Sequence, residues 1–239
     1  MASTSRAAAA TVRRSSVASA SMVVQCAGRF LVGLSIPLLA MGPSAFAHDP
    51  SEFNAKKWVV ADYQGGITVW PDNSFPGGLT GTFFDRVQNG YQQWNAVCCV
   101  DSFDFTSGTA AVSRSFGPCQ TDRDSIVFWE NFTGALAQTG QCLNDNGRVY
   151  YVGTRFDSSQ FWYAGTGQVG TNNFDFWGVA THEFGHQTGT WYGNAHFTSP
   201  ISCPGNSTDQ TMCPSLGEEQ EKLRSLEAHD IDTFQNNYP

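Results

Sequence analysis

Short runs of β-branched and aromatic residues, separated by Gly, Asn and Asp, recur between residues 58 and 170. Runs of this kind favour β-strands, and they occupy residues 58–60, 67–70, 125–129, 135–137 and 149–152. Residues 80–96 have apolar side chains at helical spacing instead, which predicts an amphipathic helix. Its apolar positions are Phe83, Phe84, Val87, Tyr91 and Trp94. The pattern predicts an α+β fold.

A second helix is predicted from Asp175 to Gly189. Polar Asn172, Asn173 and Asp175 are candidate N-caps, and an apolar run follows them. Gly189 can end the helix, because glycine adopts a positive φ that turns the chain sharply. The chain can then return toward the helix it has just left.

A last helix is predicted at residues 226–234. Ser225 can cap it, and Ala228, Ile231 and Phe234 would share a face against the core. His229 points away from that face, so we interpret it as structural.

The run His182-Glu183-Phe184-Gly185-His186 places candidate metal ligands on the second helix. The two histidines are four residues apart, so both imidazoles lie on one helical face and can bind one metal ion. Glu183 can contact a water molecule and accept its proton. A buried helix whose histidines only form hydrogen bonds is the competing interpretation.

A catalytic zinc ion usually has three protein ligands, so a third donor should follow Gly189. The candidates are Tyr192 and His196. Neutral imidazole binds zinc readily, whereas a phenol with a pKa near ~10 must first lose a proton. We therefore expect His196 to be the third ligand, with Tyr192 as its neighbour and the alternative ligand. Gly193 and Asn194 offer the extra turn that this requires.

Four segments resemble, in order, parts of the metzincin clan of zinc endopeptidases, and within it the matrixin-like secreted proteases. The segments are residues 134–140 for the edge strand that holds substrate, 175–189 for the active-site helix, 211–214 for the methionine turn and 226–234 for the closing helix. The resemblance covers residues 58–239. It departs from the family pattern at the third histidine, displaced to His196, and at His229, where the family commonly has an aspartate.

The resemblance implies a metzincin-like fold, in which a mixed twisted sheet, the active-site helix and a C-terminal helix form two lobes around a cleft. The catalytic domain would span residues 58–239, with an upper lobe at 58–189 and a lower lobe at 190–239. A short N-terminal segment at residues 48–57 would precede it.

The resemblance also implies roles for residues around the helix. Met212 would lie beneath the zinc as a structural residue of the site, together with Gly189. Leu136 and Ala137 would pair with an extended peptide, and Cys213 and Pro214 would line a pocket for one substrate side chain. These last four are grouped as substrate-binding candidates.

Residues 1–47 are interpreted as an export signal that is removed from the mature protein. They contain four arginines and no acidic residue, followed by an apolar core at residues 30–41 and the small-x-small cleavage site Ala45-Phe46-Ala47. The apolar core is shorter than the ~20 residues of a transmembrane helix. We expect a secreted protein, extracellular or periplasmic, with no membrane span.

Charge narrows the choice of partners. Four of the 13 Lys and Arg lie in the leader, which leaves nine against 21 Asp and Glu, a net charge near −12. Such a surface repels phosphates, so a nucleic-acid partner is not expected. A monomer that acts on a protein or peptide is expected.

Six cysteines follow the leader: Cys98, Cys99, Cys119, Cys142, Cys203 and Cys213. In an oxidising compartment they predict three disulfides. Cys203 with Cys213 would staple the loop before Met212. Cys98 and Cys99 would then bond separately with Cys119 and Cys142, because neighbouring cysteines rarely bridge each other.

The expected function is that of a secreted zinc metalloendopeptidase, in which one catalytic zinc ion and Glu183 activate water for peptide hydrolysis. A zinc hydrolase of a non-peptide substrate would keep the same residues. A secreted binding module with structural zinc is the second alternative, against which Glu183 argues. Calcium (Ca²⁺) is a second candidate ion at residues 142–147, although that run lacks further ligands and favours a turn.

Overall fold

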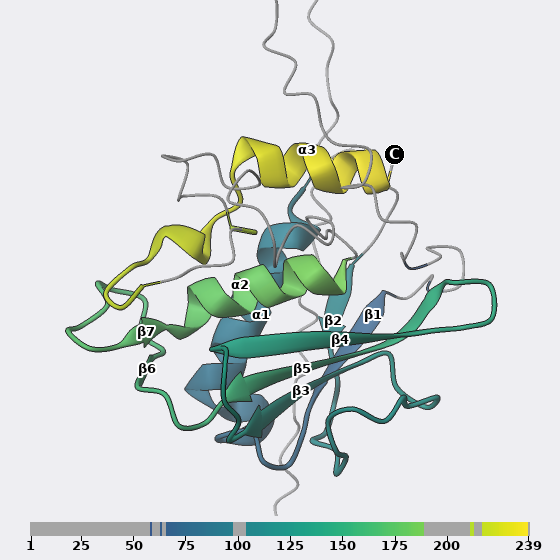
Figure 1. Cartoon of the computed structure of the whole chain (residues 1–239), viewed down its shortest axis with the longest axis horizontal. Coiled ribbons are helices and arrows are strands. Elements are labelled where there is room, and N and C mark those ends of the chain that lie inside the picture. Colours follow the sequence, from purple (N-terminus) through teal and green to yellow (C-terminus); the bar gives the residue numbers. More distant parts are fainter. Residues whose placement is uncertain are drawn as a thin grey trace, which may run out of the picture. The chain divides into compact units, whose positions relative to one another are not determined.

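The computed structural model describes Trp58, Tyr63 and residues 66–97, 104–188, 211–212 and 217–238. Every described residue belongs to one compact unit, Phe46–Pro239. The strands and α-helices, labelled in Figure 1, are β1 (Ile67–Pro71), α1 (Thr82–Asn95), β2 (Phe105–Ser107), β3 (Ser125–Glu130), β4 (Ala137–Leu143), β5 (Val149–Asp157), β6 (Trp162–Tyr163), β7 (Phe174–Asp175), α2 (Phe176–Gln187) and α3 (Ala228–Asn237). Two short 3-10 helices, η3 (Gly78–Thr80) and η5 (Lys222–Arg224), lie between them.

Five strands form one mixed sheet in the order β2-β1-β3-β5-β4 (Figure 1). β1 pairs in parallel with β2 and β3, and β3 pairs in parallel with β5. β4 pairs antiparallel with β5 and is an edge strand of this sheet. β6 and β7 form a separate parallel pair. The predicted α+β class is confirmed.

Both faces of the sheet are covered, because successive side chains of a strand point to opposite sides. Val127 and Phe156 belong to the larger apolar cluster, which includes side chains of α1 and α2. Ile126, Phe128 and Tyr151 belong to a second cluster, formed with residues of the segment between β2 and β3. This is why β3 has buried residues at successive positions.

The predicted helix at residues 80–96 is confirmed as α1, which spans Thr82–Asn95. Four of its five predicted apolar positions are buried, and the fifth, Phe83, is partly buried. α1 crosses α2 closely at Gly90, where an added Cβ would lie 2.9 Å from the backbone carbon of Ala180. A side chain at this position would push the two helices apart.

Several strand predictions differ in extent from the structure. The run at 135–137 was expected to be a strand, but β4 begins at Ala137 and continues to Leu143. β5 likewise continues from Val149 to Asp157. Trp58 is buried but lies outside the strands, and residues 59–60 are outside the described part of the chain. β2, β6 and β7 are too short for an alternating pattern to reveal.

The predicted closing helix exists as α3, but its start and its buried face differ from the prediction. Its N-cap is Glu227, which forms a capping box with Asp230, and not Ser225. Ser225 offers its backbone carbonyl to the Thr211 hydroxyl instead. Ala228 is exposed, and Phe234 is the predicted core residue that is fully buried.

One disulfide joins Cys119 to Cys142, with 5.8 Å between their Cα atoms. The expectation that these two cysteines would bond separately to Cys98 and Cys99 is therefore wrong. Cys142 lies on β4 in the second apolar cluster, and the segment preceding β3 covers that cluster, so Cys119 is brought beside it. Cys98, Cys99 and the predicted Cys203–Cys213 pair lie outside the described residues.

Residues 144–147 form the turn between β4 and β5, where Asn144 Oδ1 accepts hydrogen bonds from the backbone N–H of Asn146 and Arg148. The predicted turn is confirmed. Among the described helices, none has the length and apolar character needed to cross a bilayer. The predicted division into lobes at residue 189 is untested, because residues 189–210 are not described.

Candidate metal centre

The helix with the two histidines begins at Asp175, one of the three predicted N-caps. Its carboxylate accepts a hydrogen bond of 3.0 Å from the backbone N–H of Gly178. Arg224 donates two further hydrogen bonds of 2.8 Å to the same carboxylate. Burial raises the pKa of Asp175, and the hydrogen bonds and charge of Arg224 oppose that rise. A negative charge here also complements the positive end of the helix dipole.

His182 and His186 lie on one face of α2, as the spacing predicts. Their ring centroids are 4.7 Å apart and their planes are nearly perpendicular, at 88°. Both side chains are buried, with exposed fractions of 9% and 8%. The two imidazoles are therefore close enough to bind the same metal ion.

A backbone carbonyl fixes the tautomer of His182. Its Nδ1 lies 2.6 Å from the carbonyl oxygen of Thr211. A carbonyl can only accept, so Nδ1 must donate its proton, and Nε2 of a neutral ring then keeps a lone pair. A hydrogen bond of this kind is the usual partner of a metal-binding histidine.

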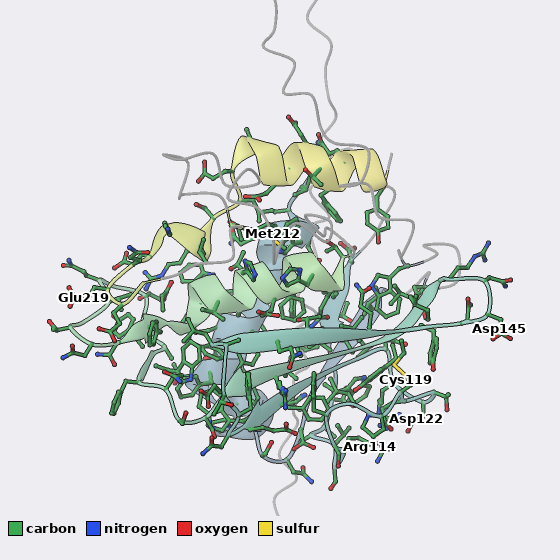
Figure 2. All side chains as sticks on the ribbon, viewed as in Figure 1. Arg114, Cys119, Asp122, Asp145, Met212 and Glu219 are labelled. Atoms are coloured by element: carbon green, nitrogen blue, oxygen red, sulfur yellow. A yellow bond between two sulfur atoms is a disulfide. The ribbon has the colours of Figure 1, made fainter. Side chains whose placement is uncertain are left out.

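The Thr211–Met212 turn is held in place by Asp230. The buried Asp230 carboxylate accepts hydrogen bonds from the backbone N–H of Thr211 at 2.9 Å and of Met212 at 3.2 Å. Met212, labelled in Figure 2, is fully buried and packs on Gly185 of α2. An added Cβ at Gly185 would lie only 2.1 Å from Met212 Sδ. Glycine between the two histidines thus lets the turn approach the helix.

Glu183 is 5% exposed and accepts a hydrogen bond of 2.5 Å from the Thr139 hydroxyl at Oε2. Burial raises the pKa of Glu183 to about 7, while the Thr139 hydrogen bond acts in the opposite direction. A carboxyl with such a pKa can accept and release a proton near neutral pH.

Side chains from distant parts of the chain satisfy the carbonyls at the end of α2, which have no partner within the helix. Gln141 donates to the carbonyl of His186 at 2.8 Å, and Trp58 Nε1 donates to that of Gln187 at 2.7 Å. Tyr238 donates to that of Thr188 at 2.6 Å. The end of the helix is thus fixed.

The donor set fits a zinc ion as far as it is described. Two buried imidazoles on one helical face, one with its second nitrogen bonded to a carbonyl, are ligands that zinc prefers. Within the described ranges, no three His, Cys, Asp or Glu side chains come together as a metal site. The predicted third ligand His196 and the alternative Tyr192 are outside those ranges.

Of the remaining predicted site residues, two lie in the part of the chain that the structure describes and three lie outside it. Ala137 is buried at the start of the edge strand β4, and Leu136 is partly buried just before it. Gly189, Cys213 and Pro214 lie outside the described residues. The structure thus brings the helix, the edge strand and Met212 into one region, and it does not test the proposed pocket.

Four residues at the site were not predicted: Thr139, Gln187, Thr211 and Asp230. Each is polar and buried. Their one sequence signal is indirect, since all four fall within the segments that resemble family elements. Polar residues in a buried strand or helix need partners, which could have marked them as a group.

No family model and no curated protein matches this sequence.

Proposed function

We propose that this chain is a zinc-dependent endopeptidase of the matrixin-like metzincin type, which acts after export from the cell. The observation that carries the proposal is the arrangement of His182, Glu183 and His186 on buried α2, with the Nδ1 proton of His182 directed to the Thr211 carbonyl. That hydrogen bond leaves Nε2 as the donor atom. A buried histidine pair with a purely structural role would not need a buried carboxyl between its two members, as Glu183 is here.

The side chains have separate roles in this proposal. His182, His186 and the predicted His196 hold the metal. A zinc ion bound there supplies Lewis acidity, which lowers the pKa of water toward about 7 and polarises a carbonyl. Glu183 accepts the proton of the attacking water and later passes it to the leaving amine. Asp230 and Met212 keep the Thr211 carbonyl in place beneath the helix.

The substrate in this proposal is an extended polypeptide. β4 pairs with β5 along one side and is an edge strand of the five-stranded sheet. An edge strand can add a peptide through main-chain hydrogen bonds, which gives affinity with little dependence on sequence. Ala137 is the first residue of β4 and Leu136 lies just before it, where such pairing would begin. Cys213 and Pro214 would select one side chain.

Metal analysis combined with a cleavage assay tests the proposal. The purified protein should contain one zinc ion and cleave a quenched fluorescent peptide and casein. A chelator should abolish cleavage, and added zinc should restore it. Zinc without any peptide cleavage would favour the non-peptide hydrolase or the binding module, and absence of zinc would reject the metal site itself.

A further inference from the structure

Five buried side chains form a continuous chain of hydrogen bonds that ends on Glu183. Ser125 Oγ lies 2.8 Å from Gln187 Oε1, and Gln187 Nε2 lies 2.9 Å from Thr154 Oγ1. Thr154 Oγ1 lies 2.8 Å from Thr139 Oγ1, which lies 2.5 Å from Glu183 Oε2. None of the five residues is more than 9% exposed. The chain links three neighbouring strands of the sheet to α2.

When Glu183 is ionised, as a base must be, counting protons fixes the direction of every bond in this chain. An ionised carboxylate only accepts, so Thr139 must donate its single hydroxyl proton to Glu183. The contact between the two threonines then uses the proton of Thr154. Thr154 must therefore accept from the Gln187 amide nitrogen, and the Gln187 amide oxygen accepts from Ser125. With the amide reversed, Thr154 would donate to Gln187, and no proton would lie between the threonines.

The amide of Gln187 thus polarises both hydroxyls toward the carboxylate. Hydrogen bonds in a buried chain strengthen one another, and water does not compete for them. A bond to a charged oxygen is the strongest member, and O–H···O⁻ contacts of about 2.5–2.7 Å are typical of it. A second contact of Thr139, to the backbone carbonyl of Glu183, is 3.5 Å long and too weak to compete.

We propose that Thr139 is a positioning residue for Glu183, which occupies Oε2 and leaves Oε1 as the oxygen that takes the proton of the attacking water. The inference rests on the proposed function, in which Glu183 is the base. Among the described residues, Thr139 is the side chain that donates to this carboxylate, and it does so at Oε2. In the proton transfer, the O–H bond of water breaks and the Oε1–H bond forms. The electron pair of the broken bond stays on the water oxygen as it attacks the carbonyl carbon.

A kinetic comparison of strand threonines tests this role. Thr139→Val removes the hydroxyl at nearly constant volume and should lower kcat about 10- to 100-fold, with KM and zinc content unchanged. Thr139→Ser keeps the hydroxyl and should retain most of the rate. Thr154→Val breaks the chain one step earlier and should cause a smaller loss. Thr106→Val, on the exposed side of β2, is the matched control and should have no effect. A Thr139→Val protein with the kcat of the wild type would overturn the proposal.

Neutron diffraction tests the same role without an activity assay and without a variant. It locates the deuterium atoms in crystals of the purified wild-type protein, grown at mildly alkaline pH. Deuterium should lie on Thr139 Oγ1 facing Glu183 Oε2, and the Gln187 amide nitrogen should face Thr154. The reverse polarity, or a Thr139 deuterium directed to Thr154, would reject the positioning role. If the wild type shows no chelator-sensitive cleavage, the proposed function fails, while the deuterium map still decides whether Thr139 holds Glu183. If the wild type cleaves and the map shows the reverse polarity, the positioning role alone fails.

Discussion

Among single residues, Glu183 is the one on which the proposed mechanism depends most. Its side chain is buried, and in the described contacts it accepts a side-chain hydrogen bond at one oxygen only, from Thr139 at Oε2. Glu183→Gln keeps the volume and can still accept the Thr139 proton, but the amide cannot take a proton from water. We expect the variant to bind zinc as the wild type does and to lose about 10²- to 10⁴-fold in kcat. Parallel measurement of zinc content and peptide cleavage checks this. Substantial turnover in the variant would remove Glu183 from the mechanism.

A second residue-level prediction concerns the third ligand. His196→Ala should lose zinc in dialysis against a competing chelator, because two imidazoles hold the metal weakly. Tyr192→Phe removes the only atom through which that residue could bind zinc and should retain the metal and most of the activity. The opposite pattern, with metal lost through Tyr192→Phe and kept in His196→Ala, would show that the shorter spacing supplies the ligand.

At the scale of elements, the close contact of α2 with the Thr211–Met212 turn depends on Gly185. In Gly185→Ala the new Cβ would meet Met212 Sδ at 2.1 Å and Trp94 Cζ2 at 2.6 Å. Overpacking of this kind costs about 1–3 kcal/mol, which outweighs the gain of about 1 kcal/mol in helix propensity. Denaturant unfolding should show the loss, and zinc affinity should fall as well.

The matched control for Gly185→Ala is a double substitution. Met212→Ala removes the sulfur that the new Cβ would meet, at the cost of a cavity. The double variant should therefore be more stable than the sum of the two single losses predicts. Strict additivity would mean that the Gly185–Met212 contact does not limit the approach of the turn.

Helices were easier to predict than strands because their patterns are longer. α1 has five apolar positions over 14 residues, and Asp175 precedes α2 as a cap. β4 shows no clear apolar pattern, because one of its buried positions is polar Thr139 and the exposed and half-buried positions include Gln138 and Gln141. Ser225 looked like a cap by residue type, but Glu227 forms the capping box because Asp230 lies three residues later.

The candidate site was predictable where its residues share one element. His182, Glu183 and His186 are read from helical spacing alone. The partners that orient them could not be predicted from local spacing. Thr139 lies 44 residues from Glu183, and Thr211 lies 29 residues from His182. Strand register and a turn held by Asp230 bring them there, and neither leaves a local pattern.

For the whole molecule, the Cys119–Cys142 disulfide should contribute to stability through the unfolded chain. It joins residues 23 apart, shown as the yellow bond beside the Cys119 label in Figure 2. Closing a loop of this length is worth about 3 kcal/mol in the chain-entropy model. The Cys119→Ser/Cys142→Ser variant should lose about that much in free energy of unfolding, measured with denaturant under oxidising conditions. A reductant should destabilise the variant less than the wild type, by about the same 3 kcal/mol. An equal loss on reduction in both proteins would contradict this contribution.

Alkaline pH should also destabilise the fold. Burial raises the pKa of Tyr151 to about 12 and raises the pKa of Tyr91 and Tyr238 above the ordinary value of about 10. The folded state therefore binds these protons more tightly than the unfolded state, and the resulting stability is complete below pH ~10. Above that pH it should fall by up to about 1.4 kcal/mol per pH unit for each tyrosine. Unfolding midpoints measured across this range should decline, and the decline should be shallower in Tyr151→Phe.

Tyr238 also determines when the candidate site can be completed during protein synthesis. The carbonyl of Thr188 receives its hydrogen bond from a side chain made 50 residues later, and the Thr211 carbonyl that orients His182 is held by Asp230 of α3. A nascent chain that has passed α2 but not α3 on the ribosome lacks both contacts. The proposed peptidase would therefore acquire its oriented histidine only as translation reaches α3, which delays proteolysis until the domain has been made.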